Sequence, residues 1–244
     1  MTAMELSLKG KVALVTGGGR GLGAACVRGL HAAGAEVIAV ARSGDQLAEL
    51  ARQCAGLQTW CEDVTGDAFL ARLRALTRLD VLVNNAGFND PQPMLEMSTE
   101  SLDNMLNLNV RSVYLASQAA LSVMQRTGGS VVNMSSQMGH VGSPKRTVYC
   151  MTKHAVEGLT KAMAVEVASL GVRVNSIAPT FVETELTRSM LADAAFAEFV
   201  EQMIPMGRLA TEEDVANAVV YLSSPAAGMI TGHSLVVDGG WTAQ

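Results

Sequence analysis

The sequence predicts a single α/β domain, in which a doubly wound parallel sheet of seven strands carries helices on both faces. Short β-branched runs alternate along the chain with longer segments of helical periodicity. The runs are apolar on both faces, which is typical of parallel strands that helices cover on each side. A length of 244 residues suits one large domain, and we expect residues 1–244 to form it.

Strands and helix-length crossovers follow one another in order. We expect strands at 11–15, 36–41, 57–61, 81–84, 130–134, 172–177 and 234–237. We expect helices at 22–33, 45–54, 68–76, 99–110, 112–126, 148–170, 186–202 and 212–222. Each crossover is long enough to hold a helix, and right-handed crossovers build a doubly wound sheet.

One segment, at about 182–208, is less regular than the rest. It places five large apolar side chains between polar residues: Met190, Phe196, Phe199, Met203 and Met206. One interpretation is a lid over a substrate pocket. The other is an ordinary amphipathic helix that packs on the domain.

Composition and charge exclude several classes of protein. Hydrophobic residues make up 49% of the chain, charged residues 17%, and the net charge is −5. This balance predicts a packed domain without the basic surface that nucleic-acid binding needs. The first residues lack the features of a signal peptide, and no stretch approaches eighteen uninterrupted apolar residues. We therefore expect a cytoplasmic protein with neither a nucleic-acid nor a membrane partner.

The four cysteines predict neither disulfides nor a metal site. Cys26, Cys54, Cys61 and Cys150 show no CxxC spacing, and their surroundings are mostly apolar. We expect buried, reduced thiols. Cys150 is the one that an oxidant or alkylating agent could reach, because it adjoins Tyr149.

A glycine-rich loop follows the first expected strand and opens the first expected helix. Glycines let the backbone approach a pyrophosphate, and the helix N-terminus supplies free amide donors. Tight turns also need glycine for their own sake, but the strand-loop-helix context favours a dinucleotide. The residues that we expect at the cofactor here are Gly17, Gly19, Arg20, Gly21, Leu22 and Gly23.

A second motif adds acid-base chemistry to this dinucleotide site. Tyr149 and Lys153 are four residues apart, so on a helix they share a face, and the ammonium favours the ionised form of the phenol. Such a tyrosine can exchange protons near neutral pH. An isolated pair of this kind is usually a solvated surface pair. Together with Ser136 and the glycine loop, it predicts redox chemistry on a nicotinamide.

At this point the chain resembles the classical short-chain dehydrogenase/reductase family over essentially its full length. The resemblance rests on TGxxxGxG at 16–23, Asp-Val at 63–64, NNAG at 84–87 and the segment 177–184. It implies a Rossmann fold. NNAG also braces the central sheet in this family, and Asp63 could simply cap the following helix. The resemblance implies cofactor contacts from Asp63, Val64, Asn85, Ala86, Gly87, Tyr149, Lys153, Pro179, Val182 and Thr184. Thr180 stands where the family usually has glycine.

The resemblance also implies a catalytic tetrad of Asn109, Ser136, Tyr149 and Lys153. Tyr149 is the general acid/base, and Lys153 lowers its pKa and binds the nicotinamide ribose. Ser136 orients the substrate oxygen. Asn109 holds a water in a proton relay, although on its own it would be interpreted as an ordinary polar surface residue.

The end of the second expected strand bears on cofactor choice. An NAD site needs a carboxylate there, whereas the 2′-phosphate of NADP needs cations. The chain has Ala41, Arg42 and Ser43 at this place, and Arg20 in the glycine loop offers a second guanidinium. We therefore predict NADP(H), with NAD(H) as the alternative. Asp45 lies beyond the strand, where we expect it to cap a helix.

These features predict an NADP(H)-dependent oxidoreductase that moves a hydride between the nicotinamide and a secondary alcohol or ketone. Possible substrates are 3-oxoacyl thioesters, polyols or sugars, and cyclic ketones. Lys145 and Arg146 precede Tyr149, and they either attract an anionic substrate or are solvated or interface charges. The alternatives are an NAD-dependent alcohol dehydrogenase and a noncatalytic regulator, which would be expected to lack Tyr149 or Lys153. The resemblance implies a homotetramer, although a dimer is also compatible.

Overall fold

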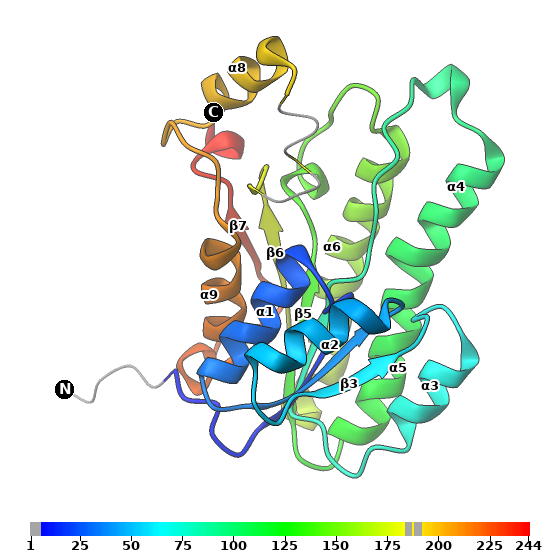
Figure 1. Cartoon of the computed structure of the whole chain (residues 1–244), viewed down its shortest axis with the longest axis vertical. Helices are drawn as coiled ribbons and strands as arrows, with labels where there is room; N and C mark the ends of the chain where they lie inside the picture. Colours follow the sequence, from blue (N-terminus) through cyan, green and yellow to red (C-terminus); the bar gives the residue numbers. More distant parts are fainter. Residues whose placement is uncertain (1–5, 184–186, 188–191) are drawn as a thin grey trace.

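Seven parallel strands form the central sheet in the order β3-β2-β1-β4-β5-β6-β7 (Figure 1). The computed structural model describes residues 6–183, 187 and 192–244. The order reverses direction between β1 and β4, so the prediction of a doubly wound seven-stranded sheet is confirmed. The strands are β1 Val12–Thr16, β2 Glu36–Ala41, β3 Gln58–Cys61, β4 Val81–Asn84, β5 Gly129–Met134, β6 Val172–Pro179 and β7 Ser234–Val237.

Helices cover both faces of this sheet (Figure 1). The α-helices are α1 Gly21–Ala32, α2 Gly44–Gln53, α3 Asp67–Arg74, α4 Thr99–Leu106, α5 Ser112–Met124, α6 Thr147–Val167, α8 Ala194–Gln202 and α9 Glu212–Ser223. Short helical turns are η1 Met94–Glu96, η2 Asn107–Arg111, η3 Gln137–Gly139, η4 Ala168–Leu170, η5 Pro225–Ala227 and η6 Trp241–Ala243. In the part of the chain described, no helix is long and apolar enough to cross a membrane.

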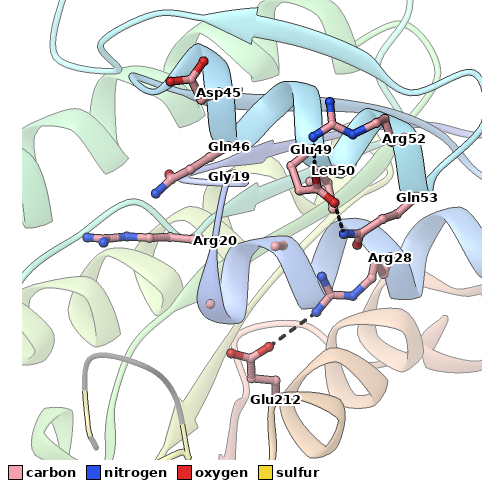
Figure 2. A pocket seen from close by; sticks show the side chains of 12 residues that line it. Gly19, Arg20, Arg28, Asp45, Gln46, Glu49, Leu50, Arg52, Gln53 and Glu212 are labelled. Atoms are coloured by element: carbon pink, nitrogen blue, oxygen red, sulfur yellow. Dashed lines mark hydrogen bonds and ion pairs between the residues drawn. The ribbon is translucent and has the colours of Figure 1, made fainter. Parts of the chain in front are cut away.

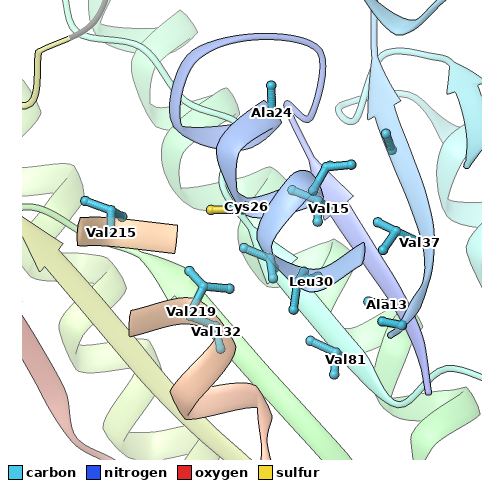
Figure 3. Close-up of a cluster of buried hydrophobic side chains, with 14 of the residues drawn as sticks. Ala13, Val15, Ala24, Cys26, Leu30, Val37, Val81, Val132, Val215 and Val219 are labelled. Carbon is cyan, nitrogen blue, oxygen red and sulfur yellow. The ribbon is translucent and has the colours of Figure 1, made fainter. Parts of the chain in front are cut away.

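Alternate residues of the central strands enter two separate hydrophobic cores. Ala13 and Val15 of β1 belong to a core with side chains of α1, α2 and α9 (Figure 3). Leu14, between them, belongs to the opposite core with side chains of α3, α5 and α6. This alternation is the period of two along a strand, with both faces apolar because both are covered.

Two expected helices differ from the prediction. The helix expected at 99–110 ends at Leu106, and the π-helical turn η2 connects it to α5. A π-helical turn inserts an extra residue that periodicity alone does not reveal. In the segment expected to be helical at 186–202, α8 spans Ala194–Gln202, and Asp193 caps it by accepting from the backbone N–H groups of Ala195 and Phe196.

Helix α8 packs on the carboxyl end of the sheet through aromatic side chains. The ring of Phe196 lies 5.6 Å from that of Phe181, which follows β6. Trp241 of η6 lies 5.8 Å from Phe181 and 6.0 Å from Phe199. The C-terminal turn η6 and α8 therefore pack together at this edge of the sheet, which fits the interpretation of this segment as an amphipathic helix that packs on the domain. The lid at 182–208 stays a prediction.

Candidate active site

A cleft of about 1660 Å³ runs along the carboxyl ends of the strands. It crosses the ends of β1 and β4, where the strand order reverses. Open parallel sheets bind ligands at this place, because loops from neighbouring strands part there in opposite directions. The walls come from the glycine loop, the loops after β2, β3 and β4, the turn η3, α6 and the segment after β6.

The glycine loop folds tightly against its own helix. A Cβ atom at Gly23 would lie 2.0 Å from the carbonyl oxygen of Gly17, so no other residue fits without moving the backbone. Gly17 and Gly21 have φ angles of +64° and +54°, which favour glycine. Arg20 occupies the N-cap position of α1, but its side chain forms no hydrogen bond with the first backbone N–H groups of the helix. The first amides of α1 therefore remain available to an anion.

The NNAG motif supports both the sheet and this loop. Asn84 Nδ2 donates to Ser117 Oγ and Asn133 Oδ1, each at 2.9 Å, inside the core. Asn85 Nδ2 donates to the carbonyl oxygens of Thr16 and Gly17, at 3.0 and 3.2 Å. The bracing role expected for this motif is confirmed, and Asn85 extends that role to the glycine loop.

Ser136, Tyr149 and Lys153 meet on one wall of the cleft. Ser136 follows β5, and its hydroxyl shares a hydrogen bond with Tyr149 on α6. The ammonium of Lys153, one turn further along α6, lies 5.5 Å from the centre of the Tyr149 ring. Lys153 Nζ also donates to the carbonyl oxygen of Met134 at 2.8 Å. The wall thus offers a phenol, a hydroxyl and an ammonium to one small ligand.

The pKa values in this wall differ from the expectation. Burial raises the pKa of Tyr149 to about 12, while the hydrogen bond with Ser136 and the charge of Arg146 oppose that rise. Burial lowers the pKa of Lys153 to about 8, against the charge of Glu157. The expected lowering of the Tyr149 pKa by Lys153 is therefore wrong for the protein alone. Desolvation outweighs the hydrogen bond with Ser136 and the positive charge of Arg146, so the net change in the Tyr149 pKa is upward.

Asn109 lies behind this wall in η2. Only 1% of it is exposed, so the interpretation as a surface residue is wrong. Its Oδ1 accepts from the backbone N–H of Phe88 at 3.0 Å, and its Nδ2 donates to the carbonyl oxygen of Phe88 at 2.8 Å. Nδ2 also reaches Thr152 Oγ1 of α6 at 3.3 Å. Asn109 therefore ties the loop after β4 to the helix of Tyr149 and Lys153.

Comparison with known proteins places this geometry in a family. The family model described as Enoyl-(Acyl carrier protein) reductase matches residues 17–242. L-xylulose reductase of Mus musculus is 40% identical over 243 residues, 98% of this chain and 100% of that protein. The 3-oxoacyl-[acyl-carrier-protein] reductase of Vibrio harveyi is 37% identical, over 96% of this chain and 98% of its own. Gluconate 5-dehydrogenase from Burkholderia cenocepacia, solved with NADP and tartrate, has a TM-score of 0.94 at 32% identity, covering 99% of this chain and 98% of its own.

The chain is a classical short-chain dehydrogenase/reductase. As a short-chain dehydrogenase/reductase it is an oxidoreductase that acts on CH–OH groups. Among the described residues no cluster of His, Cys, Asp or Glu could hold a metal ion. All four cysteines are free thiols, but only Cys26 and Cys54 are buried, since Cys150 is half-buried and Cys61 is exposed. It ends the edge strand β3, which only β2 pairs.

Most cofactor contacts expected of a short-chain dehydrogenase/reductase line the cleft. They run from the glycine loop past the ends of β2, β3 and β4 to the segment after β6. Thr184 lies outside the described residues. The expected cofactor contacts that line the cleft are Gly17, Gly19, Arg20, Gly21, Leu22, Gly23, Arg42, Asp63, Val64, Asn85, Ala86, Gly87, Tyr149, Lys153, Pro179 and Val182.

Asp63 and Asp45, for which we predicted helix-capping roles, do not cap the helices that follow them. Asp63 Oδ1 accepts from the backbone N–H and the hydroxyl of Thr65, at 2.9 and 2.7 Å, and Gly66 precedes α3 without a side-chain cap. Ser43 caps α2, since its hydroxyl accepts from the N–H of Gln46 at 3.3 Å. Asp45 lies in the first turn of α2, where a negative charge favours the helix dipole.

The two cations before Tyr149 are separated in space. Arg146 is only 8% exposed, lines the cleft, and places its guanidinium 5.9 Å from the ring centre of Phe181. Lys145 is exposed, has a φ angle of +60°, and does not belong to the described lining. The interpretation as solvated charges therefore fits Lys145 and is wrong for Arg146.

The sequence did not single out every residue of the cleft. Gln137 follows Ser136 directly and lines the same wall, and its Oε1 has no hydrogen-bond partner within the described chain. A side hollow of about 500 Å³ adjoins the cleft at Arg20, between α1 and α2 (Figure 2). Arg28 pairs there with Glu212 at 3.4 Å. The rest of the hollow comes from α1, α2 and Glu212 of α9, a meeting of distant segments that no single sequence motif reveals.

Proposed function

We propose that the protein is an NADP(H)-dependent oxidoreductase that moves a hydride between the nicotinamide and a ketone or secondary alcohol. The observation that carries this proposal is the joint placement of Ser136, Tyr149 and Lys153 in a cleft that begins at the glycine loop. The cleft fits a dinucleotide, since the closely packed Gly23 and the uncapped start of α1 leave backbone donors for a pyrophosphate. The noncatalytic alternative has no support, because Tyr149 and Lys153 are both present.

The residues of this wall can carry the proton chemistry of such a reaction. The bound nicotinamide supplies or accepts the hydride. The Ser136 hydroxyl orients the substrate oxygen, and the Tyr149 phenol donates a proton to that oxygen during reduction. Because burial raises the pKa of Tyr149 to about 12, the phenol is protonated at neutral pH. Oxidation requires the phenolate, which the charges of Arg146 and Lys153 would stabilise.

The acid-base assignment is tested by Tyr149→Phe, with Tyr114→Phe on the surface of α5 as the matched control. Tyr149→Phe should retain cofactor binding and lose turnover by a factor of about 100 or more, the scale of general acid-base catalysis. Tyr114→Phe should leave turnover unchanged. Near wild-type turnover in Tyr149→Phe would refute the assignment.

The preference for NADP(H) is supported by the charges at the end of β2. Arg42 and Arg20 line the cleft, and among the described residues neither forms an ion pair. The charge of Arg42 also acts on Asp63, so the guanidinium lies near the expected adenine side. Two guanidiniums can bind a 2′-phosphate, whereas β2 ends without the carboxylate that the ribose of NAD would need.

Fluorescence titration with NADPH and NADH tests this preference. Arg42→Ala should weaken NADPH binding by about 1.5–3 kcal/mol, the range for a hydrogen bond to a charged group, and leave NADH binding little changed. The control is Arg52→Ala, which removes an arginine that pairs with Glu49 in the side hollow. Tighter NADH binding by the wild-type protein would favour the NAD-dependent alternative.

We propose a polyhydroxylated ketone or alcohol as the substrate class. L-xylulose reductase and a gluconate 5-dehydrogenase crystallised with tartrate are among the similar proteins. Gln137 offers a buried amide beside Ser136 for a further hydroxyl. Arg146 gives the same cleft a buried positive charge, which favours a substrate that also carries an anionic group.

Matched neutral and anionic sugars or ketones, assayed at low and moderate salt, test this class. Arg146→Ala should remove the preference for the anionic member, whereas Lys145→Ala should leave it. The preference should shrink as salt rises. A preference for 3-oxoacyl thioesters or neutral cyclic ketones, unchanged in Arg146→Ala, would contradict it.

The homotetramer also stays a proposal, as does the cytoplasmic location. Three large side chains are exposed on α5 and α6: Tyr114 of α5, and Met151 and Val165 of α6. Val165 is 84% exposed, which favours burial against another subunit. Light scattering after size-exclusion chromatography distinguishes a tetramer from a dimer, and Val165→Glu should weaken the assembly if these helices form it.

A further inference from the structure

A buried carboxylate lies behind the proposed catalytic wall, on α6 one turn after Lys153. Glu157 is 5% exposed. Its Oε2 accepts from the hydroxyl of Ser176 on β6 at 2.8 Å, and its Oε1 accepts from the hydroxyl of Ser234 on β7 at 3.0 Å. A buried charge needs such donors to offset its desolvation. One side chain of α6 is thereby fixed to two strands of the sheet.

The same carboxylate meets the segment that follows Ser136. His140 Nε2 lies 2.9 Å from Ser234 Oγ and 3.5 Å from Glu157 Oε1. The turn η3 packs closely against α6, since a Cβ at Gly139 would lie 3.1 Å from both Glu157 Cγ and the carbonyl oxygen of Lys153. Glu157 therefore joins the turn that carries Ser136 to the helix that carries Lys153.

Lys153 needs a nearby negative charge more than an exposed lysine does. Its side chain is 6% exposed, and burial lowers its pKa to about 8, which the charge of Glu157 opposes. Among the described residues, the charged or titratable groups near these two include His140 after η3, and Arg146, Tyr149 and Cys150 at the start of α6. Ser176 and Ser234 are uncharged, so the two strands contribute hydrogen bonds only.

We propose that Glu157 is a positioning residue, whose buried carboxylate keeps Lys153 charged beside Tyr149 and holds the Ser136 turn against α6. This inference rests on the proposed function, because it gives the charge of Lys153 a role in turnover. Within the described part of the chain, Glu157 does not line the cleft, and it therefore acts through Lys153. Its charge extends activity toward alkaline pH, since Lys153 loses its proton only at higher pH when a carboxylate is near.

The test is Glu157→Gln, which removes the charge and keeps the shape. NADPH binding and kcat/KM for a carbonyl substrate are measured from pH 6 to pH 10. The alkaline decline of both should move to lower pH by about one unit or more, the effect of a nearby opposite charge. Glu166→Gln, on the exposed face of the same helix, is the matched control and should keep the wild-type profile.

Glu157→Asp separates charge from packing. It keeps the carboxylate but shortens its reach to Ser176 and Ser234, so it should unfold at lower temperature while its alkaline decline stays near that of the wild type. If Glu157→Gln lowers rates equally at all pH values without moving the decline, its role is structural and the inference is wrong. Failure of the proposed function would look different, because wild-type protein would then bind NADPH without reducing any carbonyl of the panel.

Discussion

Gly23→Ala and Gly29→Ala place the same methyl group on the same helix and should have opposite effects. A Cβ at Gly23 would lie 2.0 Å from the Gly17 carbonyl oxygen and 2.5 Å from Asn85 Nδ2. A Cβ at Gly29 would meet Val220 Cγ2 at 3.4 Å, an ordinary contact. Both substitutions gain about 0.5–1 kcal/mol from helix propensity, so the difference between them reports the steric contact.

The structure sets the size of that difference. The Gly17 carbonyl cannot retreat freely, because it accepts from Asn85 Nδ2 at 3.2 Å. Overpacking costs about 1–3 kcal/mol, and losing this hydrogen bond costs about 0.5–1.5 kcal/mol more. We therefore expect Gly29→Ala to be slightly stabilising and Gly23→Ala to be destabilising by about 1–4 kcal/mol.

Urea unfolding and NADPH titration of both variants measure the effect. Gly23→Ala should also bind NADPH at least about tenfold more weakly, since a shift of the loop misplaces the backbone donors. Gly29→Ala should bind it normally. If Gly23→Ala bound NADPH with wild-type affinity and unfolded at the wild-type urea concentration, the close packing inferred for the loop would be wrong.

Three further predictions concern the frame around the cleft. Burial would raise the pKa of Asp80, but hydrogen bonds from Arg78, from the N–H of Val12 and from Lys11 hold it below its usual value. A lowered pKa contributes stability that is present above about pH 4 and is lost as pH falls, so Asp80→Asn should flatten the acid side of the unfolding profile. Asn84→Ala leaves buried acceptors unpaired and should cost about 2–3 kcal/mol in urea unfolding; no loss would contradict the bracing role. Trp241→Ala removes ring contacts with Phe181 of the cleft and with Phe199 of α8, and it should raise KM more than it lowers kcat, which steady-state kinetics on the accepted substrate can refute.

Local sequence patterns were sufficient to predict the sheet and the glycine loop. The central strands are short runs that are apolar on both faces, and the loop must hold glycine because Gly23 packs against its own backbone. Such signals are contained in a few consecutive residues. The pair of Tyr149 and Lys153 could be predicted for the same reason, since spacing on a helix decides which side chains share a face.

The failures came from residues whose environment is made by distant segments. Arg146 is buried, and its guanidinium lies beside the ring of Phe181, which follows β6. The pKa of Tyr149 is raised because the folded chain excludes water from the phenol, an effect that spacing does not encode. The π-helical turn at Asn109 accompanies bonds to Phe88, which belongs to another loop.

The pairing of the strands has a consequence for how the protein folds. Ala13 pairs with Val81, Val83 with Val132, and Ile177 with Leu235, so neighbours in the sheet are far apart in the chain. Pairings of this kind form slowly, because long loops must close before any contact is gained. The cleft takes its walls from the ends of strands across the sheet, and a partly folded chain lacks it. A dinucleotide that binds only to the complete cleft would therefore stabilise the fully paired sheet relative to partly paired forms.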